Sequence, residues 1–338
     1  MSDKQYIDVR SPAEFEEYAL AGAVNIPLFN NEERAIVGTI YKQEGKQEAI
    51  KKGMTIVGPK LASMYEKLLE IKSEAGGKEL VVYCWRGGMR SGTFVSLMQT
   101  TGISCTQLQG GIRSIRKHII SDFEKEKLSQ REYVVLAGGT GTGKTNILQA
   151  LQEEGYPVIN LEGLANHRGS AFGQIGLKKR SQKQFELLLW QRLKELKDSS
   201  YFIIEAESKR IGNIFIPDFI LEGKANGRRI EMIMPLEERA EILTQTYDPK
   251  TFKNEIKEGI QKISSKLQPD IYEEISIAMK KEHYHHVSML LLRFYYDERY
   301  EHAFKQYEEK AVQLSVNNWR EGMAQFKKII NKEQIISH

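Results

Sequence analysis

A single cysteine, Cys84, stands between an apolar run and a stretch rich in glycine and arginine in the segment VYCWRGGMRS. Arg86, Gly87, Gly88 and Arg90 follow it. Loop N–H groups and arginines that converge on a sulfur favour the thiolate. A thiolate is the nucleophile that transfer of sulfur, selenium or phosphorus requires. The segment therefore predicts a catalytic cysteine in a cationic loop, and a small buried core cysteine is the alternative.

A phosphate-loop motif, GGTGTGKT, lies further along the chain and fits G-x-x-x-x-G-K-[ST] completely. Its members are Gly138, Gly139, Thr140, Gly141, Thr142, Gly143, Lys144 and Thr145. The expected strand YVVLA precedes it and the amphipathic run NILQALQEEG follows it, which is the context that the motif needs. Loop amides and the helix N-terminus attract an anion, Lys144 adds a mobile charge, and the Thr145 hydroxyl can hold Mg²⁺. The alternative is a glycine-rich turn that binds nothing.

The acidic residue expected after a later apolar strand is Glu205 in FIIEAES, with Glu207 two residues on. Nucleotide-hydrolysing enzymes usually have Asp at this place. The departure weakens the prediction of ordinary ATP hydrolysis and leaves a diphosphate-bearing substrate other than a nucleotide open.

Weaker candidates lie near the ends of other expected strands. His167 could assist proton transfer or cap its loop, and Arg168 could grip a phosphate, because α/β folds bind ligands at strand ends. Lys178-Lys179-Arg180 and Lys209-Arg210 could contact the phosphates of a nucleic acid or form a solvated face. We predict no metal site. His283, His285 and His286 are closely spaced on an expected helix, so their side chains point in different directions around it. The aromatic residues Phe294, Tyr295, Tyr296 and Tyr300 suit packing, base stacking or an apolar groove. Cys105 lies in an expected strand and suits the core.

The elements that must position these loops alternate between strands and helices, which predicts a parallel α/β sheet. Strands are expected at YIDV, ELVVYC and GISCTQLQGG, and a helix between Ser11 and Gly22. Residues 119–132 form a charged helical link. A second α/β unit follows with strands at YVVLAGG, YPVINLEG, YFIIEAES and in RRIEMIMPLEERAEIL, and from about Phe252 the pattern is helical.

Composition limits the function less than the motifs do. The 338 residues are 41% hydrophobic and 28% charged, which is ordinary for globular chains and allows two or three domains. A net charge of +4 permits nucleic acid as a partner without requiring it. Two cysteines exclude a disulfide scaffold, and MSDKQYIDVR has no apolar signal region. We expect a cytoplasmic protein without a membrane span.

The first third resembles the rhodanese family of sulfurtransferases. IDVRSPAEFEEYALAGAVNIP is similar to the opening segment of that family and LQGGIRS to its closing one. The loop departs from the common pattern, because five residues separate Cys84 from Arg90, one more than is usual. A C-x₅-R loop is the size used by cysteine phosphatases of similar fold and suits a tetrahedral, phosphate-like anion. We predict a rhodanese-like domain at 1–125, a P-loop domain at 130–250 and a helical region at 251–338.

The combination of both modules resembles the bacterial tRNA 2-selenouridine synthase family. Three further segments carry this resemblance, at 30–53, 160–173 (NLEGLANHRGSAFG) and 205–217 (EAESKRIGNIFIP). It implies replacement of the sulfur of 2-thiouridine by selenium at the wobble uridine of tRNA. Geranyl diphosphate would alkylate the sulfur, and selenophosphate would then deliver selenium.

The resemblance assigns roles to the residues named above. Cys84 would act in selenium transfer, with Arg86, Gly87, Gly88 and Arg90 binding selenophosphate, and Gly138 to Thr145 would bind the diphosphate. Substrate contacts are expected from His167, Arg168, Glu205, Glu207 and Arg210, and Mg²⁺ is a possible ion. Two alternatives stay open: an ATP-dependent kinase or cysteine phosphatase with an accessory module, and a non-catalytic protein that senses a nucleotide and docks RNA.

Overall fold

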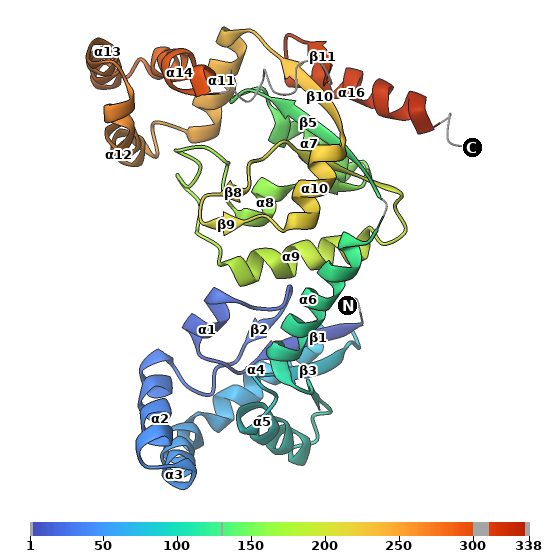
Figure 1. The fold of residues 1–338 in the computed structure, drawn as a ribbon. Coiled ribbons are helices and arrows are strands. Elements are labelled where there is room, and N and C mark those ends of the chain that lie inside the picture. Colours follow the sequence, from blue (N-terminus) through green and yellow to red (C-terminus); the bar gives the residue numbers. More distant parts are fainter. Residues whose placement is uncertain (1–2, 130, 300–310, 335–338) are drawn as a thin grey trace. The chain divides into compact units, whose positions relative to one another are not determined.

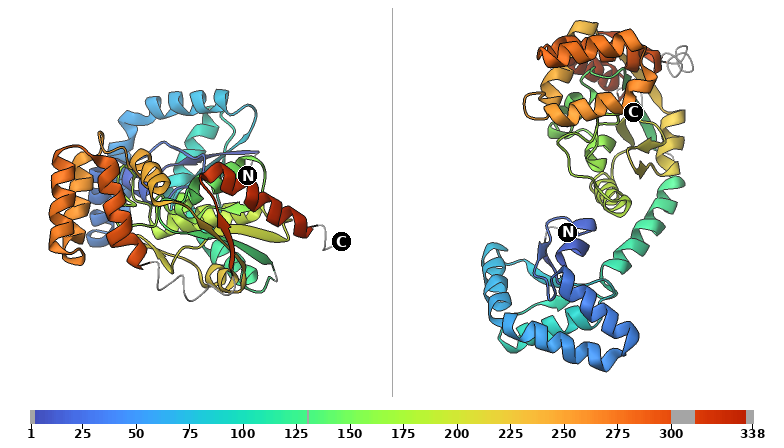
Figure 2. Two further views of the ribbon diagram at one scale, coloured as in Figure 1. Left: turned by 90° about the horizontal axis from the view of Figure 1, so that it is seen from above. Right: turned by 90° about the vertical axis from the view of Figure 1, so that its left-hand side faces the viewer.

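The computed structural model describes residues 3–129, 131–299 and 311–334 (Figure 1). The chain divides into two compact units, Met1–Lys125 with Glu186–Trp190, and Glu126–Phe185 with Gln191–His338. Figure 2 gives two further views of both units. Each unit is described by itself below.

The first unit has a parallel four-stranded sheet in the order β2-β1-β3-β4 within the described residues. Its strands are β1 (Lys4–Asp8), β2 (Val24–Asn25), β3 (Glu79–Tyr83) and β4 (Thr106–Gln107). Its helices are α1 (Pro12–Glu17), α2 (Asn31–Gln43), α3 (Lys46–Val57), η1 (Gly58–Lys60), α4 (Leu61–Glu74), α5 (Met89–Thr100) and α6 (Gly111–Lys127).

Side chains that alternate along β3 fill cores on both faces of this sheet. Leu80 and Val82 pack with residues of α4 and α5. Tyr83 points to the other face and packs with Ile112 and Ile119 of α6. The sheet is therefore covered on both faces, as the uninterrupted apolar run ELVVY predicts.

The second unit has a parallel five-stranded sheet in the order β11-β10-β5-β7-β6 within the described residues. Its strands are β5 (Glu132–Gly138), β6 (Val158–Ile159), β7 (Tyr201–Glu205), β10 (Arg228–Ile233) and β11 (Ala311–Ser315). A short antiparallel hairpin joins β8 (Arg210–Ile211) to β9 (Ile214–Phe215). Helices in this stretch of sequence are α7 (Lys144–Glu153), α8 (Leu161–Ala165), α9 (Gln182–Glu195), α10 (Asp218–Asn226) and α11 (Leu236–Tyr247).

Two helices far apart in sequence share one face of this second sheet. Leu148 of α7 and Phe326 of α16 (Trp319–Gln334) lie in one core with Leu136 of β5. Tyr133 points to the opposite face, where a Cβ on Gly223 of α10 would lie 2.3 Å from its ring. The central strand β5 is thus buried on both sides, and the loop that follows it starts from a fixed position.

The helical segment predicted from Phe252 is present, but it does not extend to the end of the chain. It contains α12 (Lys253–Ile263), η2 (Ser264–Lys266), α13 (Pro269–Lys280), α14 (Tyr284–Leu291) and the π-helical turn η3 (Leu292–Tyr296). The strand β11 then pairs in parallel with β10, which the prediction of a helical region at 251–338 missed. Only Leu314 in β11 is buried, so this five-residue edge strand lacks the apolar run by which the other strands were found.

The first helix ends at Glu17, before the predicted stop near Gly22. The charged link predicted at 119–132 is helical as far as Lys127, where it forms the second half of α6, and the division between the two units falls within it. Ser11 and Pro12 do start α1, with a capping box between Ser11 and Glu14. Among the described helices none is long and apolar enough to cross a membrane.

Candidate functional site

The cysteine loop joins the end of β3 to the start of α5. Gly87 has a φ of +63°, and a Cβ there would lie 2.6 Å from the Leu108 carbonyl oxygen. Only glycine fits such a backbone without strain. The loop is therefore held against the segment after β4, and its N–H groups can turn inward.

The Cys84 thiol lies at the base of this loop. The residue is 3% exposed, and its sulfur lies 3.1 Å from the Ser91 hydroxyl oxygen. Burial alone would raise the pKa of the thiol. Hydrogen bonds from the Ser91 hydroxyl and from the Ser91 and Gly88 N–H groups, together with the charge of Arg90, outweigh burial and hold that pKa below its ordinary value. The loop therefore stabilises the thiolate form that the sequence predicts.

Cys105 has the opposite environment. It is 2% exposed and belongs to the same apolar core as Leu80 and Val82. Burial raises the pKa of its thiol. It is the core cysteine that the sequence predicts.

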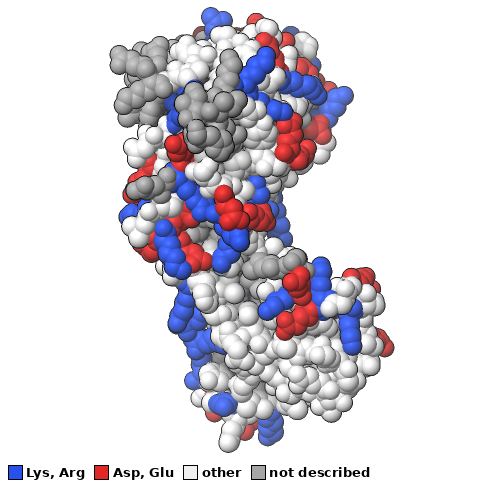
Figure 3. Space-filling model, turned by 90° about the vertical axis from the view of Figure 1, so that its right-hand side faces the viewer, with Lys and Arg blue, Asp and Glu red and all other residues white. Residues whose placement is uncertain are grey.

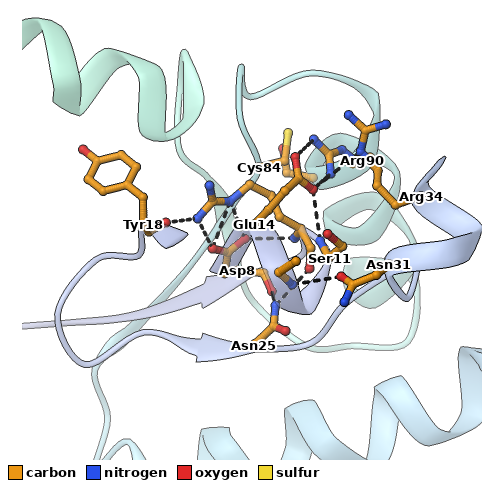
Figure 4. Close-up of polar contacts among 12 residues, drawn as sticks. Asp8, Ser11, Glu14, Tyr18, Asn25, Asn31, Arg34, Cys84 and Arg90 are labelled. Carbon is orange, nitrogen blue, oxygen red and sulfur yellow. Dashed lines mark hydrogen bonds and ion pairs between the residues drawn. The ribbon is translucent and has the colours of Figure 1, made fainter. Parts of the chain in front are cut away.

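The Arg90 side chain is paired with a carboxylate, that of Glu14 in α1 (Figure 4). The Arg90 guanidinium donates to the Glu14 carboxylate at 2.7 Å. Arg34 lies 3.5 Å from the same carboxylate, and the Ser11 N–H donates to it. Burial would raise the pKa of Glu14, but hydrogen bonds and charge from Arg90, the Ser11 N–H and Arg34 together hold it below its usual value. An anion bound in the loop must therefore either share Arg90 with the Glu14 carboxylate or displace that carboxylate.

Glu14 was not found from the sequence. It is separated from Arg90 by 76 positions, and its spacing to Ser11 marks it only as a capping residue. Arg86, in contrast, is exposed on the loop. Beneath α1, a buried Asp8–Arg10 pair with a nitrogen–oxygen distance of 2.6 Å fixes the start of this segment.

The phosphate loop leaves β5 at Gly138 and enters α7 at Lys144. Gly141 has a φ of +82°, and a Cβ there would lie 2.7 Å from the Arg239 carbonyl oxygen. The Thr142 hydroxyl donates to the Gly139 carbonyl at 2.9 Å. The Lys144 ammonium donates to the carbonyls of Gly138 and Gly139 at 2.7 and 3.0 Å, so it lies across the loop.

Three carboxylates gather beside this loop. The Thr145 hydroxyl donates to Glu162 at 2.9 Å, and the Glu162 N–H donates to Glu205 at 2.6 Å. The carboxylate oxygens of Glu162 and Glu207 both lie within 2.9 Å of the position of a Cβ on Gly169. Two of the three, Glu205 and Glu207, were predicted, and Glu162 was not.

The protonation of these carboxylates is shifted. Burial, with the charge of Glu207, raises the pKa of Glu162 to about 7, although Lys144 and Thr145 oppose the rise. Burial also raises the pKa values of Glu205 and Glu207. Glu205 is 1% exposed, and its second oxygen has no hydrogen-bond partner among the described residues. Burial of three neighbouring carboxyl groups therefore favours their protonated forms.

Arg239 of α11 supports the phosphate loop from the other side, and the sequence did not reveal it. Its Nε donates to the Thr140 carbonyl at 2.8 Å, and its guanidinium pairs with Asp297 at 2.6 Å. It is 9% exposed. Nothing in the run EERAEIL distinguishes it from a surface arginine of an amphipathic helix.

The segment after α8 holds His167 and Arg168 in structural contacts. The His167 Nδ1 accepts from the Gly169 N–H at 3.1 Å, the loop-capping contact given above as the alternative. Burial and the charge of Arg168 lower the pKa of His167. Arg168 donates to the Ile175 carbonyl at 2.8 Å and lies over the Tyr247 ring at 5.3 Å. Roles for these two residues in proton transfer or phosphate binding stay predictions.

Two of the remaining basic candidates, Arg210 and Arg180, make hydrogen bonds to the backbone of two different segments. Arg210 donates to the Gly212 carbonyl at 2.8 Å within the β8–β9 hairpin. Arg180 donates to the Gly163 and Leu164 carbonyls at 2.6 and 3.0 Å and so holds the end of α8. On the face in Figure 3, Lys and Arg are interspersed with Asp and Glu over the P-loop unit. This pattern does not locate an RNA path.

His285 and His286 point to separate partners. His286 pairs with Glu274 at 2.7 Å, and His285 lies 3.3 Å from the Glu237 carbonyl. Within the described residues, no group of three or more His, Cys, Asp or Glu could hold a metal ion. Of the aromatic set, Tyr295 and Tyr296 pack edge to face at 5.0 Å, and Tyr300 lies outside the described residues.

Two family models match the chain. Residues 1–118 match the rhodanese-like domain, and residues 131–331 match the tRNA 2-selenouridine synthase AAA domain. The fold and the two loops thus define a rhodanese-like domain fused to a P-loop domain. The second match covers more than half of the chain, and the chain belongs to the tRNA 2-selenouridine synthase family.

Curated relatives agree with this assignment. The chain is 35% identical over 251 residues to a tRNA 2-selenouridine synthase from Nitrosomonas europaea, a match over 73% of the chain and 64% of that relative. It is 36% identical to one from Hydrogenovibrio crunogenus, over 71% of the chain and 67% of the relative. The chain thus spans about two thirds of the length of these relatives. A solved N-terminal domain from Clostridium difficile 630 aligns at 40% identity with 36% of the chain and 92% of that domain, with a TM-score of 0.34.

Proposed function

We propose that this chain converts 2-thiouridine at the wobble position of tRNA to 2-selenouridine, with geranyl diphosphate and selenophosphate as co-substrates. The observation that carries the proposal is a thiolate-stabilising loop and a complete phosphate loop within one member of this family. Each loop suits one phosphorylated donor. Cytoplasmic location and binding of tRNA are part of the same proposal.

The phosphate loop would serve the alkylation step. The thiocarbonyl sulfur attacks the first carbon of the geranyl chain, the carbon–oxygen bond breaks, and diphosphate leaves with the electron pair. Loop N–H groups and Lys144 stabilise the charge that develops on this leaving group. The alkylated sulfur is then a better leaving group than a thiocarbonyl.

Magnesium fits the oxygen donors beside the loop. The Thr145 hydroxyl and the Glu162 carboxylate lie together, and both are hard oxygen ligands. Mg²⁺ usually binds through one or two protein oxygens with substrate phosphates and water. An ion held there would neutralise charge on the diphosphate.

The cysteine loop would serve selenium transfer. Cys84 would attack the phosphorus of the donor and release selenide, while Arg86, Arg90 and the N–H groups of Gly87 and Gly88 bind its phosphate. Selenium adds to C2 of the alkylated base, and the carbon–sulfur bond breaks to release geranyl thiol. Water then cleaves the sulfur–phosphorus bond on Cys84, and phosphate leaves.

The test is mass spectrometry of tRNA nucleosides after incubation with both donors. We expect geranylated 2-thiouridine to form first and 2-selenouridine to follow. Rapid ATP turnover with unchanged tRNA would instead support the kinase alternative.

Two variants separate the steps. Cys84→Ser should block selenium incorporation and let geranylated tRNA accumulate, whereas Lys144→Ala should abolish geranylation. A serine variant that makes selenouridine at the parent rate would refute the role of Cys84. A normal yield of geranylated nucleoside from the alanine variant would show that the phosphate loop does not serve the alkylation step.

A further inference from the structure

A second cation, Arg34 near the start of α2, lies beside the carboxylate that pairs with Arg90 at the cysteine loop. The Arg34 Nε is 3.5 Å from Glu14 Oε2, the same oxygen that accepts from Arg90 at 2.7 Å. Figure 4 shows Glu14 with both guanidinium groups beside it. One carboxylate oxygen therefore has two cationic neighbours, one at hydrogen-bond distance and one at the limit of that distance.

The Arg34 Nε has a hydrogen bond still to make. The side chain as a whole is 40% exposed, but this atom is buried and has no hydrogen-bond partner among the described residues. A buried N–H without a partner is costly, because it has lost its bond to water. Glu33, the preceding residue, is engaged elsewhere: it pairs with Lys60 and accepts from the Asn30 N–H at 2.8 Å. Glu14 is thus the acceptor nearest to hand.

The surroundings of Arg34 keep its guanidinium near Glu14. A Cβ on Gly38, one turn further along α2, would lie 2.6 Å from a terminal nitrogen of Arg34, so the guanidinium occupies room that a side chain at 38 would fill. The helices α1 and α2 are also joined, because Asn31 accepts from the Ala13 N–H at 2.9 Å. Both partners of the pair therefore come from connected elements.

The Glu14 carboxylate can move from one cation to the other with little rearrangement. Its Oε2 also accepts from the Ser11 N–H at 3.1 Å, a bond of the capping box that does not depend on Arg90. A shift of about 0.6 Å would bring Oε2 to the usual distance of about 2.9 Å from the Arg34 Nε. The carboxylate would then keep Ser11, lose Arg90 and gain Arg34.

We infer that Arg34 is a positioning residue, which takes the Glu14 carboxylate when an anion binds Arg90 in the cysteine loop. The inference rests on the proposed function in one respect, because that anion would be the phosphate of the donor. Without Arg34, a carboxylate that leaves Arg90 loses a charged partner and gains none. With Arg34, the exchange at Arg90 costs less free energy, and the loop binds its anion more tightly.

The test measures how well inorganic phosphate protects Cys84 of the full chain from iodoacetamide, read at the peptide level by mass spectrometry. The phosphate concentration that halves the alkylation rate reports binding at the cysteine loop alone, even if phosphate also binds the phosphate loop. Arg34→Gln should raise that concentration about fivefold, the effect expected of one partly exposed ion pair. Arg34→Lys should bind phosphate nearly as the parent does, because an ammonium can also pair with Glu14.

A double-mutant cycle separates this role from direct contact with the anion. Glu14→Gln leaves no carboxylate to be taken up. Adding Arg34→Gln to it should therefore change the protecting concentration by less than about twofold at about 0.15 M salt, where distant charges are screened. The same fivefold loss in both backgrounds would show that Arg34 acts on the anion itself and would overturn the inference. Tight binding by the double variant also shows that Arg34→Gln leaves the fold intact.

Lys42→Gln is the matched control, because Lys42 is exposed on the same helix, about 12 Å along its axis from Arg34. It removes one positive charge and should leave protection unchanged, and a loss equal to that of Arg34→Gln would count against the inference. If phosphate does not protect Cys84 in the parent, the anion site of the proposed function fails and the inference fails with it. If phosphate protects the parent and Arg34→Gln alike, the inference fails and the proposed function stands.

Discussion

The Ser91 hydroxyl should set much of the acidity of Cys84, and Ser91→Ala tests this. Its oxygen lies 3.1 Å from the sulfur and accepts a hydrogen bond from the Gln107 amide at 2.8 Å. The hydroxyl proton is therefore available to the sulfur, since its other acceptor, the Gly88 carbonyl, is at 3.4 Å. This hydrogen bond stabilises the thiolate more than the neutral thiol. Removing the Ser91 hydroxyl should therefore raise the pKa of the Cys84 thiol.

The size of the effect follows from the strength of a hydrogen bond to a charged group. Such a bond contributes about 1.5–3 kcal/mol, and one pKa unit corresponds to about 1.4 kcal/mol, which sets a ceiling of about two units. The N–H groups of Gly88 and Ser91 and the charge of Arg90 remain in the variant. We therefore expect a rise of about one unit.

The assay is the pH dependence of Cys84 alkylation by iodoacetamide, read at the peptide level by mass spectrometry. Cys105 in the same chain is the internal reference, because burial raises the pKa of its thiol. Ser96→Ala, on the exposed face of the same helix, is the matched control and should react as the parent does. A midpoint that stays at the parent value would show that the N–H groups alone stabilise the thiolate. A midpoint that falls would show that the thiol donates to Ser91, and either result would refute the assignment.

Three further predictions concern charged side chains. Glu14→Gln should strengthen binding of a phosphate probe at the cysteine loop by up to about tenfold, measured by calorimetry, because Arg90 loses its charged partner; weaker binding would contradict this. The pKa of Glu162 is raised from 4.5 to about 7, so the folded chain holds a proton that the unfolded chain loses, and stability from this group falls as pH rises through that window. Glu162→Gln should reduce this loss of stability with rising pH, which urea midpoints measured at both ends of the window would show. The same change of midpoint with pH in the parent and the variant would refute the prediction. Arg239→Ala should lower the free energy of unfolding by about 2 kcal/mol, because it removes the bond to Thr140 and leaves Asp297 unpaired; a urea midpoint equal to that of the parent would exclude this role.

Both loops could be predicted from the sequence because each is built from consecutive residues. In each case an apolar strand ends, glycines allow unusual backbone angles, and a helix follows. Gly87 and Gly141 take positive φ values within closely packed turns, so the glycine pattern carries real geometric information.

The charged residues that complete both sites could not be predicted, because their contacts are distant in sequence. Glu14 reaches Arg90 across 76 positions, and Arg239 reaches Thr140 across 99. Local patterns assign Glu14 to a helix cap and Arg239 to a helix surface. Their second roles arise only when the sheet brings separate helices to the carboxyl ends of the strands.

The missed strand β11 has a related cause. A central strand is recognisable because it is buried on both faces, as Val135 to Gly138 are. An edge strand of five residues with one buried side chain has no such signal. Its place in the sheet depends on pairing with β10, which is a contact between distant segments.

In each site, the cationic group already faces a carboxylate. Arg90 is paired with Glu14, and Lys144 lies in the field of Glu162 and Glu207. Anion binding at the cysteine loop is therefore an exchange, in which the incoming anion takes over Arg90 from Glu14. At the phosphate loop the incoming anion takes over Lys144 from the Gly138 and Gly139 carbonyls, beside the two carboxylates. A singly charged anion gains little from such an exchange, whereas a phosphate or diphosphate carries more charge and more acceptor oxygens than the carboxylate that it replaces. Nearby carboxylates would thus select for highly charged ligands at both loops, which is the property that the two proposed phosphorylated donors share.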